Sequence, residues 1–351
     1  MCIRDRPNLK VMTGAMTQRL TFDGNRCSGV HFQVNGEDLI ATANLEVIIS
    51  AGAVNSPKLL ELSGVGDGAR LKPLGIEVVS NLVGVGENLQ DHLQLRMAYQ
   101  VSGVKTLNTL SARWWGKLAI GVEYVLKRSG PMAMAPSQLG VFANSGTDGP
   151  TARADIQYHV QPLSLEKFGE PLHAFDAFTA SVCQLRPTSR GTIHIKSLDA
   201  AVAPAIAPNY LSTEYDKLVA VNALKYTRRI VSARALEKYE PKEILPGEQF
   251  QTDDELIRAA GNVGTTIFHP VGTCQMGRKG DIGAVVDSRL RVFGVVGLRV
   301  VDASIMPTIT SGNTNSPTVM IAEKASRMLK QDRKTANRIN LFELLVSSTA
   351  E

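Results

Sequence analysis

The segment that most constrains the fold runs from residue 298 to about residue 329. Residues 298–301 form a short apolar run that predicts a buried strand, with Asp302 at its carboxyl end. A polar loop holding Asn313 follows, and Pro317 then opens a predicted helix. Because α/β proteins place cofactors at the carboxyl ends of buried strands and the amino ends of helices, this segment predicts a ligand site in an α/β fold.

A second segment, residues 268–277, offers one histidine among apolar neighbours. In such surroundings the pKa of His269 can be tuned toward the working pH of an enzyme. His269 as a base, Asn313 as a hydrogen-bonding amide and the helix start at Pro317 form a combination suited to alcohol oxidation.

The composition narrows the class of protein. A chain of 351 residues with 44% hydrophobic content can bury a large core and is expected to form two lobes. The net charge of +5 is small and the basic residues are scattered, so we expect no nucleic-acid partner. The four cysteines form no Cys-x-x-Cys pair, which disfavours a disulfide framework or a zinc site. With no transmembrane segment or signal peptide visible, we expect a cytoplasmic protein, and peripheral membrane association stays open.

The first part of the chain predicts strands followed by one helix. The predicted strands are 8–13, 17–22, 29–35, 46–50 and 76–79. Asn55-Ser56-Pro57 is predicted to cap a helix after the fourth strand. Residues 64–69 meet the relaxed G-x-G-x-x-A pattern, but they follow a helix instead of a strand, so they are rejected as a dinucleotide fingerprint.

From residue 93 the pattern changes to alternating strands without crossover helices, which predicts an antiparallel sheet and a second lobe. These strands are 94–101, 155–161, 178–185 and 191–196. His159 and His194 are interpreted as sheet-face residues and His92 as a structural hydrogen-bonding residue, since no spacing suits a metal. Helices are predicted at 114–127, 212–235 and 252–260. We expect the first to pack against the core, with a lid as the alternative.

Several motifs together resemble the glucose–methanol–choline (GMC) oxidoreductase family of flavoenzymes. Four segments resemble family signatures in the family's order: residues 52–66, 85–92, 268–277 and 301–308. Residues 15–17 and 311–317 make the choline dehydrogenase-like branch the nearest. The resemblance extends from about residue 8 to residue 329.

The family's chain begins with a strand, a G-x-G-x-x-G turn and a helix that grip FAD, and this sequence shows no such element. It therefore resembles the C-terminal part of a longer enzyme, lacking the N-terminal FAD-binding βαβ unit. The implied fold class is α/β, with α+β character in the second lobe. Residues 1–92 and 281–330 are expected to form a discontinuous, incomplete Rossmann-like FAD-binding domain. Residues 93–280 are expected to form a substrate domain with an antiparallel sheet flanked by helices, and residues 331–351 a frayed tail.

The resemblance implies FAD as cofactor and oxidation of a primary or secondary alcohol to an aldehyde or ketone, with hydride transfer to flavin N5. His269 would be the general base and Asn313 the amide that bonds the substrate oxygen. The implied cofactor-binding residues are Thr17 near the adenine, Asn88 beside the flavin, Asp302 and Ala303 near the ribityl and phosphate groups, and Asn315 and Thr318 beside the isoalloxazine. No metal is expected.

Other functions stay open at this point. Some relatives on this scaffold are lyases that keep FAD without redox turnover, and a catalytically incompetent binding module is the non-enzymatic alternative. The alcohol substrate is a small molecule of unknown identity. The electron acceptor can be oxygen, a quinone or another carrier.

Overall fold

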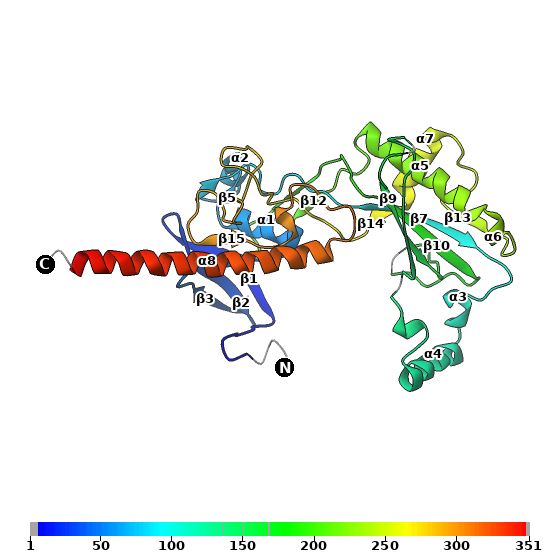
Figure 1. The fold of residues 1–351 in the computed structure, drawn as a ribbon, viewed down its shortest axis with the longest axis horizontal. Coiled ribbons are helices and arrows are strands. Elements are labelled where there is room, and N and C mark those ends of the chain that lie inside the picture. Colours follow the sequence, from blue (N-terminus) through cyan, green and yellow to red (C-terminus); the bar gives the residue numbers. More distant parts are fainter. Residues whose placement is uncertain (1–5, 136, 150, 168, 349–351) are drawn as a thin grey trace.

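The computed structural model describes residues 6–348 except 136, 150 and 168. It consists of two lobes, and segments from both ends of the chain lie in the first lobe (Figure 1). That lobe begins with an antiparallel meander of β1 (Ala15–Asp23), β2 (Arg26–Val34) and β3 (Glu37–Thr42). The hairpin between β2 and β3 turns through Asn35 and Gly36, both at positive φ, as a tight hairpin requires. The strand expected at residues 8–13 does not form, and β3 was not predicted.

The centre of the first lobe joins residues about 250 positions apart in sequence. β4 (Val47–Ile49) pairs in parallel with β15 (Leu298–Val300), which confirms the buried strand before Asp302. α1 (Gly52–Leu62) follows β4 and starts at Gly52, three residues before the predicted cap. The earlier start has a physical cause, because the Asp302 carboxylate accepts a hydrogen bond from the backbone N–H of Gly52.

The apolar core of this lobe draws on both ends of the chain. Its buried members include Leu20, Val47, Leu60, Val285, Leu298, Ile305 and Ile321. The short elements around it are β5 (Val65–Gly66), α2 (Gly68–Leu71), η2 (Lys72–Leu74), β6 (Ser80–Asn81) and η4 (Ala303–Ile305). The strand predicted at residues 76–79 is wrong, since the parallel partner of β5 begins only at Ser80.

The second lobe is built on a six-stranded antiparallel sheet, as predicted. The path runs β13 (Lys242–Leu245), β7 (Leu93–Gln100), β10 (Ala177–Gln184), β9 (Ile156–Gln161) and β8 (Leu139–Ala143), and β14 (Gly264–Thr266) also pairs with β7. Residues 191–196 contribute β11 (Thr192–His194), which pairs with β12 (Ala205–Ala207) outside this sheet.

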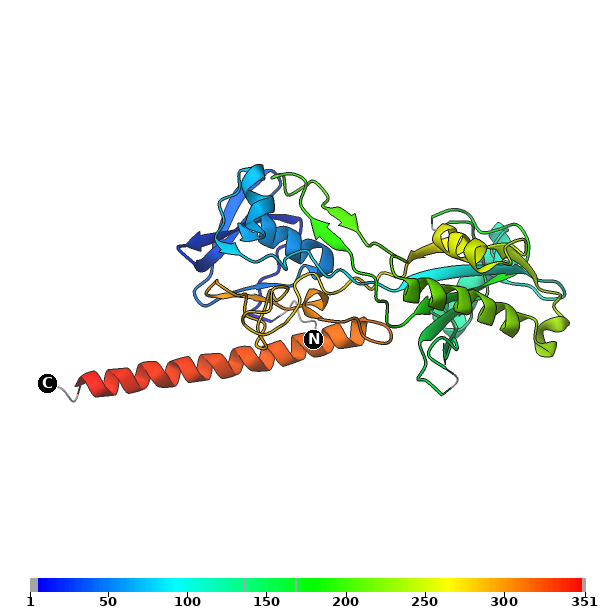
Figure 2. The same cartoon turned by 90° about the horizontal axis from the view of Figure 1, so that it is seen from above.

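Two helices cover one face of the large sheet (Figures 1 and 2). α5 (Glu214–Val231) is capped by the Thr213 side chain, and α6 (Arg234–Glu237) follows it. α7 (Asp253–Val263) opens with a reciprocal capping box between Thr252 and Glu255. Leu224 and Leu256 are fully buried in the second apolar core between these helices and the sheet.

α4 (Trp114–Lys127) has the predicted bounds but not the predicted packing. It follows α3 (Leu107–Leu110), precedes η3 (Pro131–Ala133) and lies below the sheet in Figure 1. None of its residues is buried, and Trp114 and Leu126 are 70% and 75% exposed. The expectation that it packs against the core is therefore wrong, because its connecting segments carry it away from the sheet.

α8 (Asn315–Ser348) is a single helix of 34 residues. The prediction of a frayed tail from residue 331 is wrong over the described residues. Figures 1 and 2 show the helix running along the first lobe and projecting beyond it. The sequence past residue 329 is rich in good helix formers, and Asp332 binds Arg289 and Arg299 of the first lobe.

Candidate functional site

Two segments far apart in sequence pair at the junction of the lobes. Gln90 and Val271 exchange backbone hydrogen bonds of 3.0 and 2.9 Å, and the N–H of Ile267 donates to the carbonyl of His92 at 3.3 Å. This pairing brings the residue 88–92 loop alongside the segment that holds His269. Neither loop is part of a long strand, so their pairing could not be read from periodicity.

Asn88 and Gln90 attach a third loop, which contains Pro307 and Ile309, to these two segments. The Asn88 amide nitrogen donates to the carbonyls of Gly272 and Pro307, at 3.3 and 3.2 Å. Gln90 donates to the Pro307 carbonyl and accepts from the backbone N–H of Ile309, both at 3.1 Å. Gly272 lies at φ +95°, and a Cβ there would come within 2.4 Å of the Asn88 carbonyl oxygen. The three loops therefore fit together only with glycine at this position.

Asp91 fixes the main chain at His269. Its carboxylate accepts the backbone N–H of His269 at 3.0 Å and the hydroxyls of Tyr210 and Thr266. Phe268 lies at φ +63°, a conformation that residues with a side chain adopt rarely and that is found at functional sites. The hydrogen bond from the His269 N–H to Asp91 thus fixes the backbone that carries the His269 ring.

His269 faces the ring of His92. The two Nδ1 atoms lie 3.1 Å apart, and the rings meet edge to face at 84° with centroids 5.3 Å apart. His92 is fully buried, and its Nε2 lies 3.2 Å from the Leu185 carbonyl oxygen. Burial lowers the pKa of His92 to about 4, and burial also lowers the pKa of His269. Both rings are therefore neutral near pH 7, and a neutral imidazole can accept a proton.

The sheet of the second lobe presents a polar face on this side. Alternation along β9 puts Tyr158 on the apolar face, where its hydroxyl bonds Thr227 of α5. Gln157 and His159 lie on the opposite face. The register sets polar side chains of β7 and β10 beside them: Gln94, Arg96, Thr179 and Ser181. All four are buried. A sheet face that is both buried and polar indicates a surface shaped for a ligand instead of one for packing.

Three buried polar atoms near this face have no hydrogen-bond partner within the described residues. They are Oε1 of Gln157, Nε2 of His159 and Oγ1 of Thr310. Leaving such an atom unsatisfied costs roughly 1–3 kcal/mol, so native structures normally pair it with protein, water or ligand. These hydrogen-bonding atoms suit a polar ligand between β9 and the loop at residue 310.

Asn313 belongs to the same place. Its side-chain oxygen accepts a hydrogen bond of 3.0 Å from the Gln157 amide, which links the loop before α8 to β9. Asn315 is exposed at the start of α8, and Thr318 in the first turn bonds back to the Thr314 carbonyl. The amino end of a long helix carries partial positive charge that suits an anionic group. The cofactor-binding roles of Asn315 and Thr318 stay predictions.

Asp302 is held by the protein itself. Its carboxylate accepts hydrogen bonds from Gly52 and Ser56 on one oxygen and from the N–H and hydroxyl of Ser304 on the other. The side chain thus caps η4 and holds the start of α1. Because these four hydrogen bonds occupy the carboxylate, a cofactor at this point would contact the backbone instead of the Asp302 side chain. The cofactor-binding role of Asp302 and Ala303 stays a prediction.

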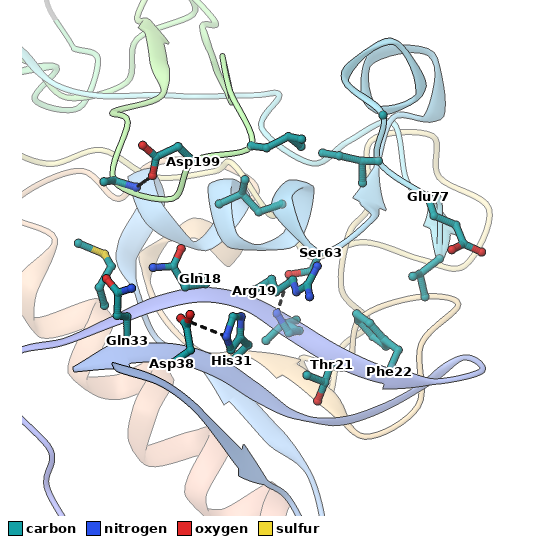
Figure 3. A pocket seen from close by; sticks show the side chains of 18 residues that line it. Gln18, Arg19, Thr21, Phe22, His31, Gln33, Asp38, Ser63, Glu77 and Asp199 are labelled. Carbon is teal, nitrogen blue, oxygen red and sulfur yellow. Dashed lines mark hydrogen bonds and ion pairs between the residues drawn. The ribbon is translucent and has the colours of Figure 1, made fainter. Parts of the chain in front are cut away.

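Thr17 lies apart from the histidine pair, on β1. A cavity of about 1070 Å³ borders this strand, and Met16 and Gln18 line it on either side of Thr17 (Figure 3). His31 and Asp38, whose side chains lie 3.4 Å apart, also line it. Neither His269 nor Asn313 lines this cavity, so it is separate from the loops that hold the two histidines. The adenine contact at Thr17 stays a prediction.

Sequence reasoning singled out His269 and Asn313 but did not find their neighbours. Asp91 and His92 stand in the motif 85–92, so a signal was present, although His92 was interpreted only as structural. Gln157 and His159 could have been found from the alternation in β9, where two polar residues share one face. Within the described residues, no group of three or more His, Cys, Asp or Glu is arranged to hold a metal ion. The same residues include no helix long and apolar enough to cross a membrane.

Models of one family, described as GMC oxidoreductase, match two parts of the chain. The N-terminal domain model matches residues 3–94, and the C-terminal domain model matches residues 187–322. The expectation that the chain lacks the family's N-terminal unit is therefore wrong. The matched part forms the β1–β3 meander, β4 and α1, so that domain is recognised without the glycine-rich turn.

Two curated relatives carry the name oxygen-dependent choline dehydrogenase. The protein from Burkholderia multivorans (strain ATCC 17616 / 249) is 40% identical over 338 residues, which cover 96% of this chain and 59% of that protein. The protein from Escherichia coli O17:K52:H18 (strain UMN026 / ExPEC) is 42% identical over 330 residues, covering 93% and 58%. The chain therefore spans less than two thirds of the length of these relatives.

Solved structures share the fold. Pyridoxine 4-oxidase from Mesorbium loti has a TM-score of 0.80 at 27% identity, over 93% of this chain and 59% of that chain. A formate oxidase from Aspergillus oryzae RIB40 has a TM-score of 0.87 at 25% identity, over 95% and 63%. The predicted fold class, an α/β domain joined to a substrate domain with an antiparallel sheet, is confirmed.

Proposed function

Since the chain belongs to the GMC oxidoreductase family, we propose that it oxidises a primary or secondary alcohol to an aldehyde or ketone with FAD as cofactor. The observation that carries the proposal is the neutral His269 ring, held by fixed loops beside a buried polar sheet face. FAD supplies the hydride acceptor when it is bound. We also propose that the chain lies in the choline dehydrogenase-like branch, as the relatives' names suggest.

His269 takes the hydroxyl proton of the substrate in this proposal. A neutral base is needed because negative charge develops on the substrate oxygen as hydride leaves the carbon. Burial lowers the pKa of His269, which keeps the ring unprotonated and ready to accept. Asp91 holds the backbone of His269 in place, so the base does not need to be ordered during the reaction.

Asn313 supplies the second group. Because its Oδ1 accepts the hydrogen bond from Gln157, its Nδ2 is left as a donor. A fixed N–H donor stabilises negative charge on the substrate oxygen and lowers the barrier together with the base. Gln157 therefore sets which end of the Asn313 amide faces the substrate.

For the cofactor, we propose contacts from Thr17, Asn88, Asp302, Ala303, Asn315 and Thr318. The amino end of α8 would stabilise negative charge on the flavin. We propose that residues 1–92 and 281–330 serve FAD and residues 93–280 the substrate. The two separate apolar cores support two units, although Val271 and Cys274 pack in the first core.

The substrate is proposed to be a polar alcohol. The unsatisfied atoms of Gln157, His159 and Thr310 suit a substrate with hydrogen-bonding groups beyond the reacting hydroxyl. Choline is one alcohol to test, because relatives carry the name choline dehydrogenase. Polyols and aryl alcohols are tested beside it. Oxygen is the first electron acceptor to test, followed by quinones.

The test is anaerobic mixing of the FAD-loaded protein with a panel of alcohols while the flavin absorbance is followed. The proposal expects bleaching by at least one alcohol, together with an equal amount of aldehyde or ketone. His173→Gln is a matched control, since that histidine bonds Ser164 and Glu166 and is not one of the proposed site residues, so it should leave bleaching unchanged. A cyanohydrin added to the panel tests the lyase alternative, because its cleavage would give a carbonyl product and cyanide without bleaching. Retention of FAD with neither product nor bleaching would indicate a binding module.

A further inference from the structure

We propose that His92 is a positioning residue that holds His269 in the tautomer with its proton on Nδ1. The unprotonated Nε2 of His269 is then the atom that takes the substrate proton. The catalytic consequence rests on the proposed function, whereas the tautomer is a property of this chain alone.

His92 contacts Leu185, the residue that follows β10. Nε2 of His92 lies 3.2 Å from the carbonyl oxygen of Leu185. A carbonyl oxygen only accepts hydrogen bonds, so Nε2 must carry a proton. His92 is fully buried and its pKa is depressed to about 4, so the ring is neutral and has one N–H. The Thr310 carbonyl also lies near the ring, but within the described residues the ring nitrogens meet hydrogen-bond geometry only with Leu185 and His269. Its Nδ1 is therefore an acceptor.

The rings of His92 and His269 meet through their Nδ1 atoms. The two Nδ1 atoms are 3.1 Å apart, and a hydrogen bond between them needs one proton. Since His92 Nδ1 has none to give, the donor is Nδ1–H of His269. A neutral His269 then carries its lone pair on Nε2. Within the described residues, no hydrogen bond that involves the His269 ring uses Nε2.

The reverse arrangement, with Nδ1–H of His92 as the donor, requires His92 either to leave the Leu185 carbonyl without its N–H or to be charged. A donor at both nitrogens would make His92 an imidazolium with no solvent exposure. The carboxylate of Asp91 already accepts from the His269 backbone, Tyr210 and Thr266. The remaining titratable neighbour is His159, whose charge would repel a second one. The surroundings thus exclude the charged form at neutral pH.

His92 is also held in place, as a positioning residue must be. Its carbonyl accepts the N–H of Ile267, and its ring is anchored on Leu185 of the sheet lobe. The Leu185 carbonyl thus determines which nitrogen of His92 is protonated, and His92 in turn determines which nitrogen of His269 carries its proton. A histidine that served only packing would not set the tautomer of its neighbour.

Two substitutions separate these roles. His92→Phe keeps a ring but removes the acceptor, which leaves Nδ1–H of His269 without a partner. His92→Gln keeps both functions, since its amide oxygen can accept from His269 and its amide nitrogen can donate to Leu185. His269→Gln assigns the His269 signals.

The experiment is ¹⁵N NMR of the ring nitrogens in histidine-labelled protein, which distinguishes protonated from unprotonated nitrogens. We expect Nδ1–H for His269 in the wild type and in His92→Gln, and a shift toward Nε2–H in His92→Phe. An Nε2–H tautomer in the wild type would overturn the proposal even if His92→Phe does not fold. Retention of Nδ1–H in a folded His92→Phe would overturn it as well.

Kinetics of the FAD-loaded enzyme give the second readout. Loss of one orienting hydrogen bond in His92→Phe should lower kcat about tenfold with KM nearly unchanged, and His92→Gln should restore most of it. If no alcohol is oxidised but the tautomer follows the expected pattern, the proposed function fails and the tautomer assignment stands. If alcohol is oxidised but the tautomer is Nε2–H, the assignment alone fails.

Discussion

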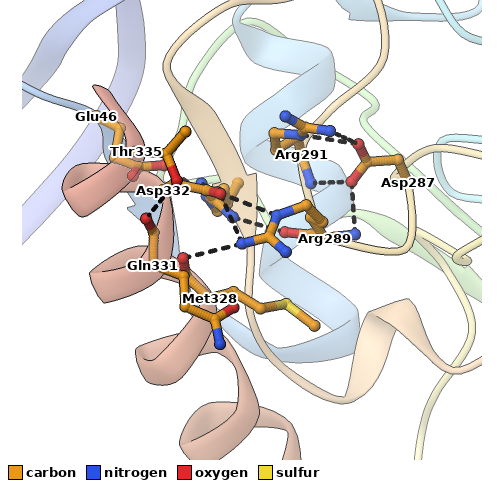
Figure 4. Close-up of polar contacts among 9 residues, drawn as sticks. Glu46, Asp287, Arg289, Arg291, Met328, Gln331, Asp332 and Thr335 are labelled. Atoms are coloured by element: carbon orange, nitrogen blue, oxygen red, sulfur yellow. Dashed lines mark hydrogen bonds and ion pairs between the residues drawn. The ribbon is translucent and has the colours of Figure 1, made fainter. Parts of the chain in front are cut away.

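Replacing Asp332 with asparagine removes the charge that ties α8 to the first lobe (Figure 4). One carboxylate oxygen lies 2.6 Å from Arg289, and the other lies 2.7 Å from Arg299 and 3.2 Å from Arg289. The side chain of Arg299 is only 4% exposed and keeps Glu46 at 2.6 Å as its second partner. The substitution therefore weakens a shared network without leaving a buried charge alone.

The expected loss of stability depends on how exposed the side chains of this network are. A hydrogen bond to a charged group contributes about 1.5–3 kcal/mol when buried, and exposed ion pairs contribute about 0–1 kcal/mol. The Asp332 side chain is 34% exposed and Arg299 retains Glu46. We therefore expect Asp332→Asn to lower the free energy of unfolding by about 1 kcal/mol.

Urea unfolding followed by circular dichroism measures this loss. Glu323→Gln is the matched control, an exposed acid on the same helix that makes no ion pair within the described residues; it should change stability by less than about 0.5 kcal/mol. Burial raises the pKa of Asp332, but hydrogen bonds from Arg299 and Arg289 outweigh it and lower the pKa overall. A carboxyl group with a depressed pKa stabilises the folded state at pH values above its ordinary, unfolded pKa. That stabilisation is lost as the pH falls through the folded pKa. If Asp332→Asn loses no more stability than the control, the helix beyond residue 329 is not docked.

Three further outcomes test the loops and their histidines. Because the folded pKa of His92 is depressed to about 4, the free energy of unfolding should fall as the pH drops from about 6.5 toward 4, by at most roughly 3 kcal/mol, and His92→Gln should flatten this dependence in urea titrations. His194 has the opposite sign: its hydrogen bond to Glu61, 2.7 Å long, raises its pKa, so its contribution is full below the unfolded pKa and is lost as the pH rises through the folded pKa. His194→Gln should therefore cost more stability at pH 5.5 than at pH 8.5, and equal losses at the two pH values would contradict the assignment. Gly272→Ala should lower the free energy of unfolding by about 2 kcal/mol or more, since its Cβ would meet the Asn88 carbonyl at 2.4 Å; a neutral effect in thermal unfolding would show that the three loops are loosely joined.

Local chemistry made part of this structure predictable. The capping box at Thr252 marks the start of α7, and the apolar run before Asp302 became β15. Alternation in residues 94–101, 155–161 and 178–185 gave three strands of the large sheet. Each signal depends on neighbours within a few residues, which a sequence displays directly.

Contacts between distant segments were not predictable in the same way. His92 and His269 are 177 residues apart, and no period in either segment shows that their loops pair. The exposure of α4 could not be predicted for a similar reason. The periodicity of its apolar residues indicates a helix, but it does not show whether another part of the chain packs against that helix. α8 continues past residue 329 partly because Asp332 meets arginines from the loop before β15 and from β15 itself.

The most direct test of the central claim is the rate of flavin reduction by an alcohol and by its α-deuterated form, measured without oxygen in wild type and His269→Ala. We expect deuterium to slow reduction in the wild type, because the carbon–hydrogen bond breaks in that step. We also expect His269→Ala to retain FAD but to reduce it at least about a hundredfold more slowly. Equal loss of FAD and of reduction in His269→Ala would show that the histidine is structural. Unchanged reduction in that variant would show that another group removes the proton.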